Sequence, residues 1–405
     1  MSNRSATDTI KGYFYQFDLS IDQLLKLDDE DSYIDIERIE DLDITESSEK
    51  IAVQCKYYSK TEYNHSVISK PIRQMLSHYK DSIVNNKKAI KYKLYGYYRS
   101  GQDKLNWPLS VDEFKENFLI FTEKKKKIRF HEEIKLSDSE IDGFINRVHV
   151  DIKASSYDEQ YCNIIKLLSK IFSCSNFEAE HYYYNNALNK IREISILDDE
   201  EKRRITKRDF LSSINKKEML YNTWFINKIG QDAYFKRIRK QYFTSNGLNT
   251  SPYERVFSFS IKDNEDFYEV KTLILKIQHK WSKLSKRDTD NSYCPYIYIH
   301  NAKEQYLIEL KKALRNEGFK LIDGFDFYGD DFNVSSITQK ATFNNEIKIK
   351  FFNSESNLYE SLNQIIKTKE VYQFYNDSPY LKIDDKSIRK IDIQVSCIKD
   401  IMEIC

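Results

Sequence analysis

The sequence predicts an α/β protein of three parts: a mixed α/β domain over residues 1–130, a helical middle over 131–250 and a C-terminal α/β domain over 251–405. Three observations lead to this prediction. The first hundred residues read as helix, three strands, helix and strand; the middle carries helical stripes behind capping boxes; and strand and helix patterns alternate from about residue 250. A length of 405 residues agrees with two to three domains.

The N-terminal elements follow from hydrophobic periodicity. Apolar residues at spacings of three and four predict a helix over 8–27, and alternation predicts strands over 33–45, as two short strands or one bent strand, and over 51–58. Pro71 suits the first turn of a further helix. Residues 91–98 close the unit as another strand.

Capping signals and turns organise the rest of the chain. The pairs Ser137–Glu140 and Ser156–Glu159 are capping boxes that open helices in the middle. The turn-rich string 246–252 predicts the boundary near residue 250. Beyond it we expect helices at 264–286 and 302–316 and strands at 255–261, 293–301, 319–327, 346–352 and 370–376.

Composition excludes several classes of protein. Lysine and arginine number 64 against 63 acidic residues, so the net charge of +1 rules out a uniformly basic nucleic-acid coat. The 9 glycines and 5 prolines are too few for collagen, a glycine-rich solenoid or a turn-dense β-sandwich. An aromatic content of 14% favours packed domains over disorder.

Cysteine usage and hydropathy predict the compartment. The six cysteines are scattered without a CxxC pair, which predicts free thiols in a reducing cytoplasm instead of a disulfide framework or zinc ribbon. The first residues lack the apolar segment of a signal peptide, and no stretch approaches 18 apolar residues. We therefore expect a cytoplasmic protein without membrane contact.

Charge is distributed unevenly along the first domain. Residues 1–48 carry 4 basic and 13 acidic side chains, a net −9, whereas residues 49–130 carry 18 basic and 8 acidic, a net +10. Two interpretations are open: solvated surfaces of opposite sign, or an acidic metal pocket beside a basic wall for phosphates.

The strand pattern favours the pocket. Neighbouring residues of a strand face opposite sides, and one face of the 33–45 segment collects the acids Asp35, Glu37, Asp41 and Asp43. A hairpin through 46–50 would bring Gln54 and Lys56 beside that acidic face. Clustered carboxylates with a nearby lysine suit Mg²⁺ or Mn²⁺ and hydrolysis of a phosphodiester, since hard cations prefer oxygen ligands.

The order of these residues resembles the PD-(D/E)xK nucleases, in the branch whose third motif is Q-x-K. That branch combines a G-x-x-x-Q helix, an E-x-x-x-D strand and Q-x-K, which are matched here by Gly12 with Gln16, Glu37 with Asp41, and Gln54 with Lys56. The resemblance covers residues 8–98 and implies a restriction-endonuclease-like αβββαβ core. No proline precedes Asp41, and Glu37 or Asp43 would complete the metal site with Asp41.

The resemblance also implies a function. Such domains occur in double-stranded DNA endonuclease effectors of bacterial antiphage systems, including CBASS and Lamassu. It implies activation through oligomerisation or through a sensor or ATPase partner of the SMC-like or HerA type, because the chain has no ATP-binding motif of its own. Residues 251–405 would serve as sensor or docking domain.

Supporting roles and alternatives complete the prediction. Gln16 would support the catalytic residues Asp41, Gln54, Lys56 and Glu37 from the first helix. Lys70 and Arg73, at the start of the second helix, are candidates for binding the nucleic-acid backbone. A restriction-type enzyme that reads sequence or modification, a non-catalytic sensor with a decayed nuclease fold, and RNA as the substrate remain open.

Overall fold

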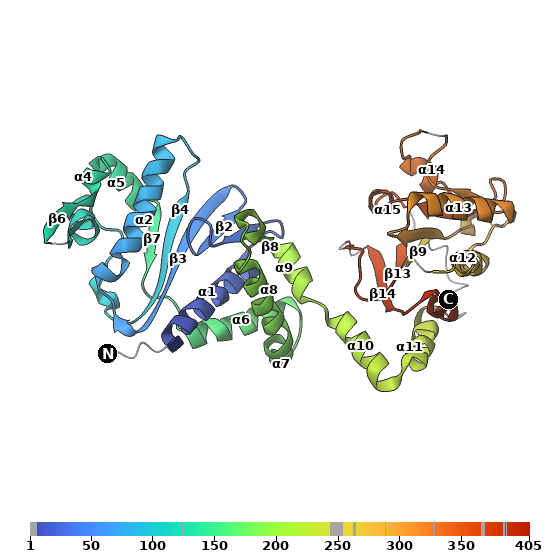
Figure 1. The fold of residues 1–405 in the computed structure, drawn as a ribbon, viewed down its shortest axis with the longest axis horizontal. Coiled ribbons are helices and arrows are strands. Elements are labelled where there is room, and N and C mark those ends of the chain that lie inside the picture. Colours follow the sequence, from blue (N-terminus) through green and yellow to red (C-terminus); the bar gives the residue numbers. More distant parts are fainter. Residues whose placement is uncertain are drawn as a thin grey trace. The chain divides into compact units, whose positions relative to one another are not determined.

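A computed structural model describes residues 6–123, 125–243, 254–261, 265–287, 289–327, 329–365, 369–383, 385 and 387–405. The chain forms two compact units, Met1–Asn215 and Lys216–Cys405 (Figure 1). Each unit has helices around a six-stranded sheet, which confirms the predicted α/β class. Within the described residues, no helix combines the length and apolar composition needed to cross a bilayer.

This division differs from the predicted boundaries at 130 and 250. The segment after residue 130 supplies two outer strands of the first sheet. β7 (Val148–Asp151) pairs with β4 (Lys91–Ser100), and β8 (Arg204–Thr206) pairs with β1 (Tyr33–Ile36). The predicted helical middle, residues 131–250, is therefore divided between the two units and does not form a part of its own. The turn-rich string 246–252 lies outside the described residues.

The first unit contains the predicted order of helix, three strands, helix and strand. Its sheet has the strand order β7-β4-β3-β2-β1-β8, with β3, β4 and β7 parallel and the remaining pairs antiparallel. The elements are α1 (Ala6–Lys26), β1 (Tyr33–Ile36), β2 (Leu42–Glu46), β3 (Glu49–Glu62), α2 (His65–Val84) and β4 (Lys91–Ser100).

The two faces of this sheet bury separate cores. Along β3, Val53 and Cys55 pack toward α1, whereas Ala52 packs toward α2. The α1 face is also covered by α6 (Tyr157–Ile171), α8 (Asn185–Ser195) and α9 (Lys207–Ile214), and the short α7 (Asn176–Glu178) packs on α6. The α2 face carries α3 (Val111–Phe114), α4 (Phe130–Glu133), α5 (Asp138–Ile145) and a hairpin of β5 (Ile120–Glu123) and β6 (Lys126–Arg129).

The second helix begins earlier than predicted. It starts at His65, so Pro71 lies buried inside α2 and not in its first turn. A proline there removes one backbone hydrogen bond of the helix. Burial of Ile68, Ile72 and Met75 in the α2-side core compensates for this loss. Such burial depends on tertiary packing and cannot be predicted from the local sequence.

The second unit is built on a wholly parallel sheet of order β11-β12-β10-β9-β13-β14. Its strands are β9 (Glu254–Ser260), β10 (Tyr296–His300), β11 (Lys320–Ile322), β12 (Ile347–Phe352), β13 (Lys369–Tyr375) and β14 (Ile388–Gln394). One core packs against α11 (Gln231–Ile238), α12 (Phe267–Trp281), α13 (Glu304–Asn316) and α16 (Ile398–Ile404). The opposite core packs against α14 (Val334–Thr338) and α15 (Glu355–Leu362), and α10 (Lys217–Ile229) leads into the unit.

Candidate active site

The candidate site lies where β2 and β3 separate. The antiparallel pairing of β2 with β3 ends at Leu42 and Val53, and β3 continues without that partner. Asp41, the residue before β2, fills the opening: its Oδ2 accepts a 2.8 Å hydrogen bond from the backbone N–H of Cys55. The carboxylate thus accepts a backbone hydrogen bond of β3 at the point where β2 no longer provides an acceptor.

Two glutamine side chains hold the same oxygen of Asp41. Gln54, on β3 and 6% exposed, donates from Nε2 to Asp41 Oδ2, and Gln16 on α1 donates to that atom over 3.0 Å. Within the described residues, Asp41 Oδ1 accepts no hydrogen bond. One oxygen is therefore fixed by three donors, while the other stays available to a ligand.

The loop from Glu37 to Asp41 brings two glutamates beside this carboxylate. The N–H of Glu37 donates to the backbone oxygen of Asp41 over 3.1 Å, and Glu37 adopts a left-handed φ of 53°. Burial, followed by the charge of Asp41, raises the pKa of Glu37, and the cations Arg203 and Lys56 oppose the shift. Burial and the charges of Asp41 and Asp43 raise the pKa of Glu40 to about 7.

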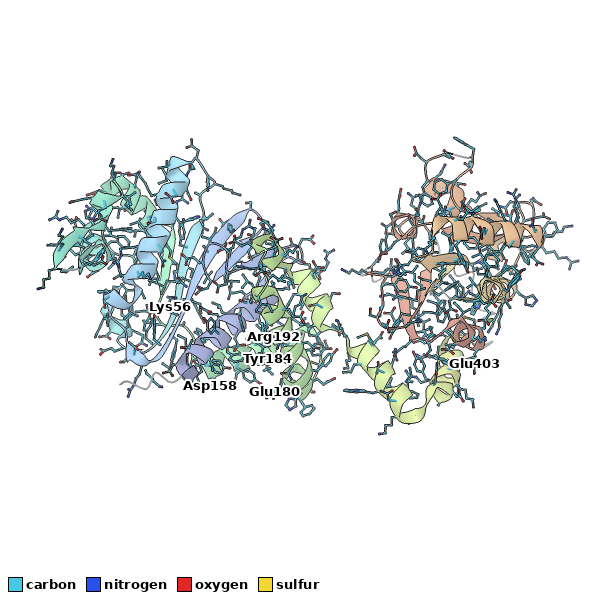
Figure 2. All side chains as sticks on the ribbon, viewed as in Figure 1. Lys56, Asp158, Glu180, Tyr184, Arg192 and Glu403 are labelled. Atoms are coloured by element: carbon cyan, nitrogen blue, oxygen red, sulfur yellow. The ribbon has the colours of Figure 1, made fainter. Side chains whose placement is uncertain are left out.

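Lys56 stands next to these acids on β3. It shares the strand face of Gln54, is half-buried, and acts electrostatically on both Glu37 and Glu40. Within the described part of the chain its ammonium makes no hydrogen bond or ion pair. Figure 2 places Lys56 on the inner part of the first unit, between α1 and α2. The ammonium is thus available to a water molecule or to an anionic ligand.

Asp43 belongs to a different set of contacts. Its carboxylate pairs with Lys50 at 3.1 Å and accepts hydrogen bonds from the backbone N–H groups of Ile39 and Glu40 at 3.2 and 3.3 Å. Burial raises the pKa of Asp43, and Lys50 opposes that shift. These partners already satisfy the carboxylate, so Asp43 fits a structural role better than that of a metal ligand.

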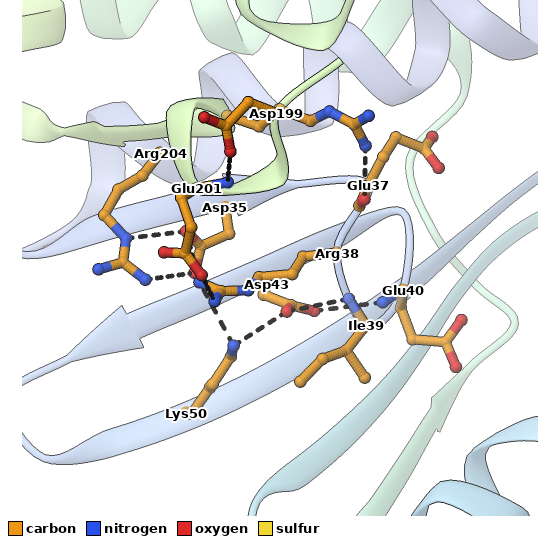
Figure 3. A network of polar contacts seen from close by, with 11 residues as sticks. Asp35, Glu37, Arg38, Ile39, Glu40, Asp43, Lys50, Asp199, Glu201 and Arg204 are labelled. Carbon is orange, nitrogen blue, oxygen red and sulfur yellow. Dashed lines mark hydrogen bonds and ion pairs between the residues drawn. The ribbon is translucent and has the colours of Figure 1, made fainter. Parts of the chain in front are cut away.

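The neighbouring Asp35 extends this structural network (Figure 3). It is fully buried and accepts two hydrogen bonds from the Arg204 guanidinium, at 2.8 and 3.2 Å, which ties β1 to β8. Figure 3 shows the side chains of Glu37 and Glu40 leaving the network on the side opposite Arg204. Within this short segment, Asp35 and Asp43 therefore belong to the structural network, whereas the side chains of Glu37 and Glu40 point away from it.

The two predicted backbone-binding cations differ in their surroundings. Lys70 is exposed on α2 and makes no hydrogen bond or ion pair with a described residue. Arg73 donates to the backbone oxygen of Phe118 over 3.0 Å and lies 4.0 Å from the ring centroid of Phe121. Arg73 thus fastens the β5 hairpin region to α2, and of these two cations Lys70 is the one that no described residue engages.

Glu40 is the acidic residue that the strand pattern missed. Its even position would place it with the apolar residues if 33–45 were one continuous strand. The segment instead breaks after Ile36 into a loop, and alternation of faces does not apply there. The adjacent like charges at 40 and 41, with another acid at 37, are the signal that could have indicated a turn of clustered carboxylates.

At this site two carboxylates, and not three, are placed to bind a cation. Among the described residues, no group of three or more His, Cys, Asp and Glu is arranged to hold a metal ion. Asp41, through Oδ1, and Glu37 can supply one carboxylate each. This donor set fits Mg²⁺, which is commonly bound by one or two carboxylates together with waters and substrate phosphates.

No family model matches the sequence, and no curated protein matches it significantly.

Proposed function

We propose that the chain is a Mg²⁺- or Mn²⁺-dependent DNA endonuclease of the PD-(D/E)xK type in its Q-x-K form. The observation that supports this most is the set of contacts of Asp41: three donors fix Oδ2, Oδ1 accepts no hydrogen bond within the described residues, and the charges of Asp41 and Lys56 both act on Glu37. The order α1-β1-β2-β3-α2-β4 agrees with the restriction-endonuclease-like core of that superfamily.

Each residue has a separate task in this proposal. Asp41 and Glu37 hold the cation, which supplies Lewis acidity toward a phosphate oxygen. Gln54 and Gln16 fix the orientation of the Asp41 carboxylate through their amides. Lys56 orients the attacking water or stabilises the negative charge that develops on the phosphate. Lys70 binds the DNA backbone.

The second unit has a regulatory role in the proposal. It has its own sheet and its own cores, so it folds around contacts that the candidate site does not share. We assign it to restraint, oligomerisation or docking of a sensor or ATPase partner of the SMC-like or HerA type. The setting in antiphage defence rests on the sequence resemblance alone.

A non-catalytic sensor with a decayed nuclease site is the second candidate. The lack of a three-ligand metal cluster among the described residues favours it. Binding of a partner that is unchanged in Lys56→Ala, together with an inert wild type, would be its signature.

Plasmid cleavage tests the proposal. The full chain, alone and with proteins encoded beside it, is incubated with supercoiled DNA and Mg²⁺, Mn²⁺ or EDTA. Asp41→Ala and Lys56→Ala should each lower the rate by about 100-fold or more. Lys60→Ala is the matched control, because Lys60 lies on the same strand but pairs with the exposed Asp8 at 2.9 Å.

Three outcomes separate the hypotheses. Metal-dependent cleavage that both site variants lose supports the nuclease, and a smear instead of defined fragments opposes a restriction-type enzyme. Cleavage that survives both substitutions removes the proposed site. Cleavage of RNA in preference to DNA would correct the substrate.

A further inference from the structure

Gly12 is an unexplained glycine in the middle of α1. Apart from proline, glycine is the residue least suited to a helix interior. Its backbone does not need glycine, because its φ is not in the left-handed region. A Cβ built at Gly12 would meet no described atom within 4 Å outside its own helix and chain neighbours. Neither backbone conformation nor packing therefore requires a glycine here.

A second helical glycine shows what a packing requirement looks like. In α5, a Cβ on Gly143 would come within 2.7 Å of the Tyr79 hydroxyl, so a side chain there would require Tyr79 to shift. Among the described residues Gly12 has no such neighbour, so the space beside it is open to that part of the chain.

That open space adjoins the candidate site. Residues four apart lie one above the other on a helix, so Gly12 lies one turn before Gln16 on the same face of α1. Gln16 reaches Asp41 from that face. The two sequence neighbours of Gly12 both reach solvent: Lys11 is exposed, and Tyr13 is 57% exposed.

We propose that the bare helix turn at Gly12 is where a strand of duplex DNA comes closest to the protein backbone beside the cleavage site. This inference rests on the proposed nuclease function. Glycine allows a ligand to approach a backbone that any side chain would shield. The neighbouring Lys11 is exposed, with its ammonium 5.9 Å from the ring centroid of Tyr157, and supplies a cation for the phosphates.

Gly12→Ala and Gly12→Leu test the proposal through two measurements. Thermal unfolding of Gly12→Ala should occur about 2–4 °C higher than in the wild type, because alanine is the better helix former and the space is free. The Kd for a fluorescein-labelled DNA duplex of about 20 base pairs, measured by anisotropy, should rise a few-fold for Gly12→Ala and at least about tenfold for Gly12→Leu.

Asn163→Leu is the matched control. Asn163 is an uncharged, exposed residue inside α6 of the same unit, and leucine there should leave the Kd unchanged. Wild-type binding by a stable Gly12→Leu protein would overturn the inference while leaving the nuclease proposal intact. A lower melting temperature for Gly12→Ala would overturn it also, since the space would then not be free. A wild type that neither binds nor cuts DNA would overturn both.

Discussion

The Nε2 amide of Gln16 in α1 donates a 3.0 Å hydrogen bond to Oδ2 of Asp41, a residue 25 positions later in the chain. This contact joins the first helix to the opening between β2 and β3. Gln54 and the Cys55 N–H hold the same oxygen from β3. The orientation of Asp41 is therefore set jointly by the helix and by the strand.

Removal of the Gln16 amide should weaken catalysis without unfolding the protein. In Gln16→Leu, Asp41 keeps the two donors from β3 but loses the one from α1. We expect cleavage to fall about tenfold and a higher Mg²⁺ concentration to be needed for half-maximal rate. Gln23→Leu on the same helix is the control, since its amide contacts Asp22 instead. An unchanged Mg²⁺ requirement would show that Gln16 only packs.

Asp43 should matter to stability more than to metal dependence. Asp43→Ala leaves Lys50 without its close partner and two backbone N–H groups without an acceptor. Since the carboxylate is fully buried, urea unfolding should show a loss on the order of 3 kcal/mol. Asp8→Ala breaks an exposed pair with Lys60 and should cost about 1 kcal/mol or less. A stable Asp43→Ala protein with a raised Mg²⁺ requirement would make Asp43 a ligand after all.

How far the site could be predicted depends on local strand geometry. The alternation of faces grouped Glu37, Asp41, Gln54 and Lys56. In the structure Glu37 and Asp41 lie in the loop between β1 and β2, where alternation does not apply, and hydrogen bonds within that loop and from Gln54 bring them together. Glu40 lies in the same loop and was missed because its even position placed it on the apolar face of the strand assumed over 33–45. The partners of Arg73 were equally hidden, since Phe118 is 45 residues away.

The limits of the domain boundaries have a different cause. Helix and strand patterns in 131–215 gave no indication that β7 pairs with β4 or that β8 pairs with β1. Strand pairing depends on long-range contacts that local periodicity does not encode. The helical middle was therefore predicted as a part of its own, although its outer strands complete the first sheet.

Glu37 stores backbone strain at the candidate site. Its φ of 53° is unfavourable for a residue with a side chain, so Glu37→Gly should stabilise the first unit by about 1 kcal/mol. The same substitution removes a proposed ligand and should lower cleavage by about 100-fold. Thermal unfolding and plasmid nicking measure the two effects.

Lys135→Gly provides the matched control for Glu37→Gly. Lys135 has the same φ of 53° and lies exposed after α4. It should give the gain in stability without the loss of cleavage. If both glycine variants retain full activity, Glu37 holds no catalytic cation.

Alanine substitutions of Lys70 and Arg73 should have different effects on the salt dependence of DNA binding. Lys70 is exposed without a described partner, so Lys70→Ala should reduce the slope of log Kobs against log salt by about 0.9. Arg73→Ala should leave the slope unchanged and lower the melting temperature, because it releases Phe118 and Phe121. Anisotropy titrations at several salt concentrations measure the slopes, and the reverse pattern would exchange the two roles.

A buried carboxyl group on α1 should make stability depend on pH. Asp18 is fully buried; its Oδ1 accepts a 2.8 Å hydrogen bond from the Tyr184 hydroxyl, and its Oδ2 has no partner in the described residues. Burial raises the pKa of Asp18 to about 7, although the Tyr184 hydrogen bond opposes the shift (Figure 2 marks Tyr184). The folded state therefore holds this proton more tightly than the unfolded chain.

The sign of the pH effect follows from that difference. The contribution of Asp18 to stability is complete below pH about 4, declines as the pH rises toward 7, and is lost above it. Asp18→Asn should match the wild type near pH 4 and exceed it at pH 8 by a few kcal/mol, since each pKa unit corresponds to about 1.4 kcal/mol. Tyr184→Phe should steepen the decline, because it removes the hydrogen bond that lowers the pKa. Urea unfolding at pH 4.5, 6 and 8 measures all three proteins, and parallel pH profiles for the wild type and Asp18→Asn would mean that Asp18 ionises in the fold as readily as in the unfolded chain.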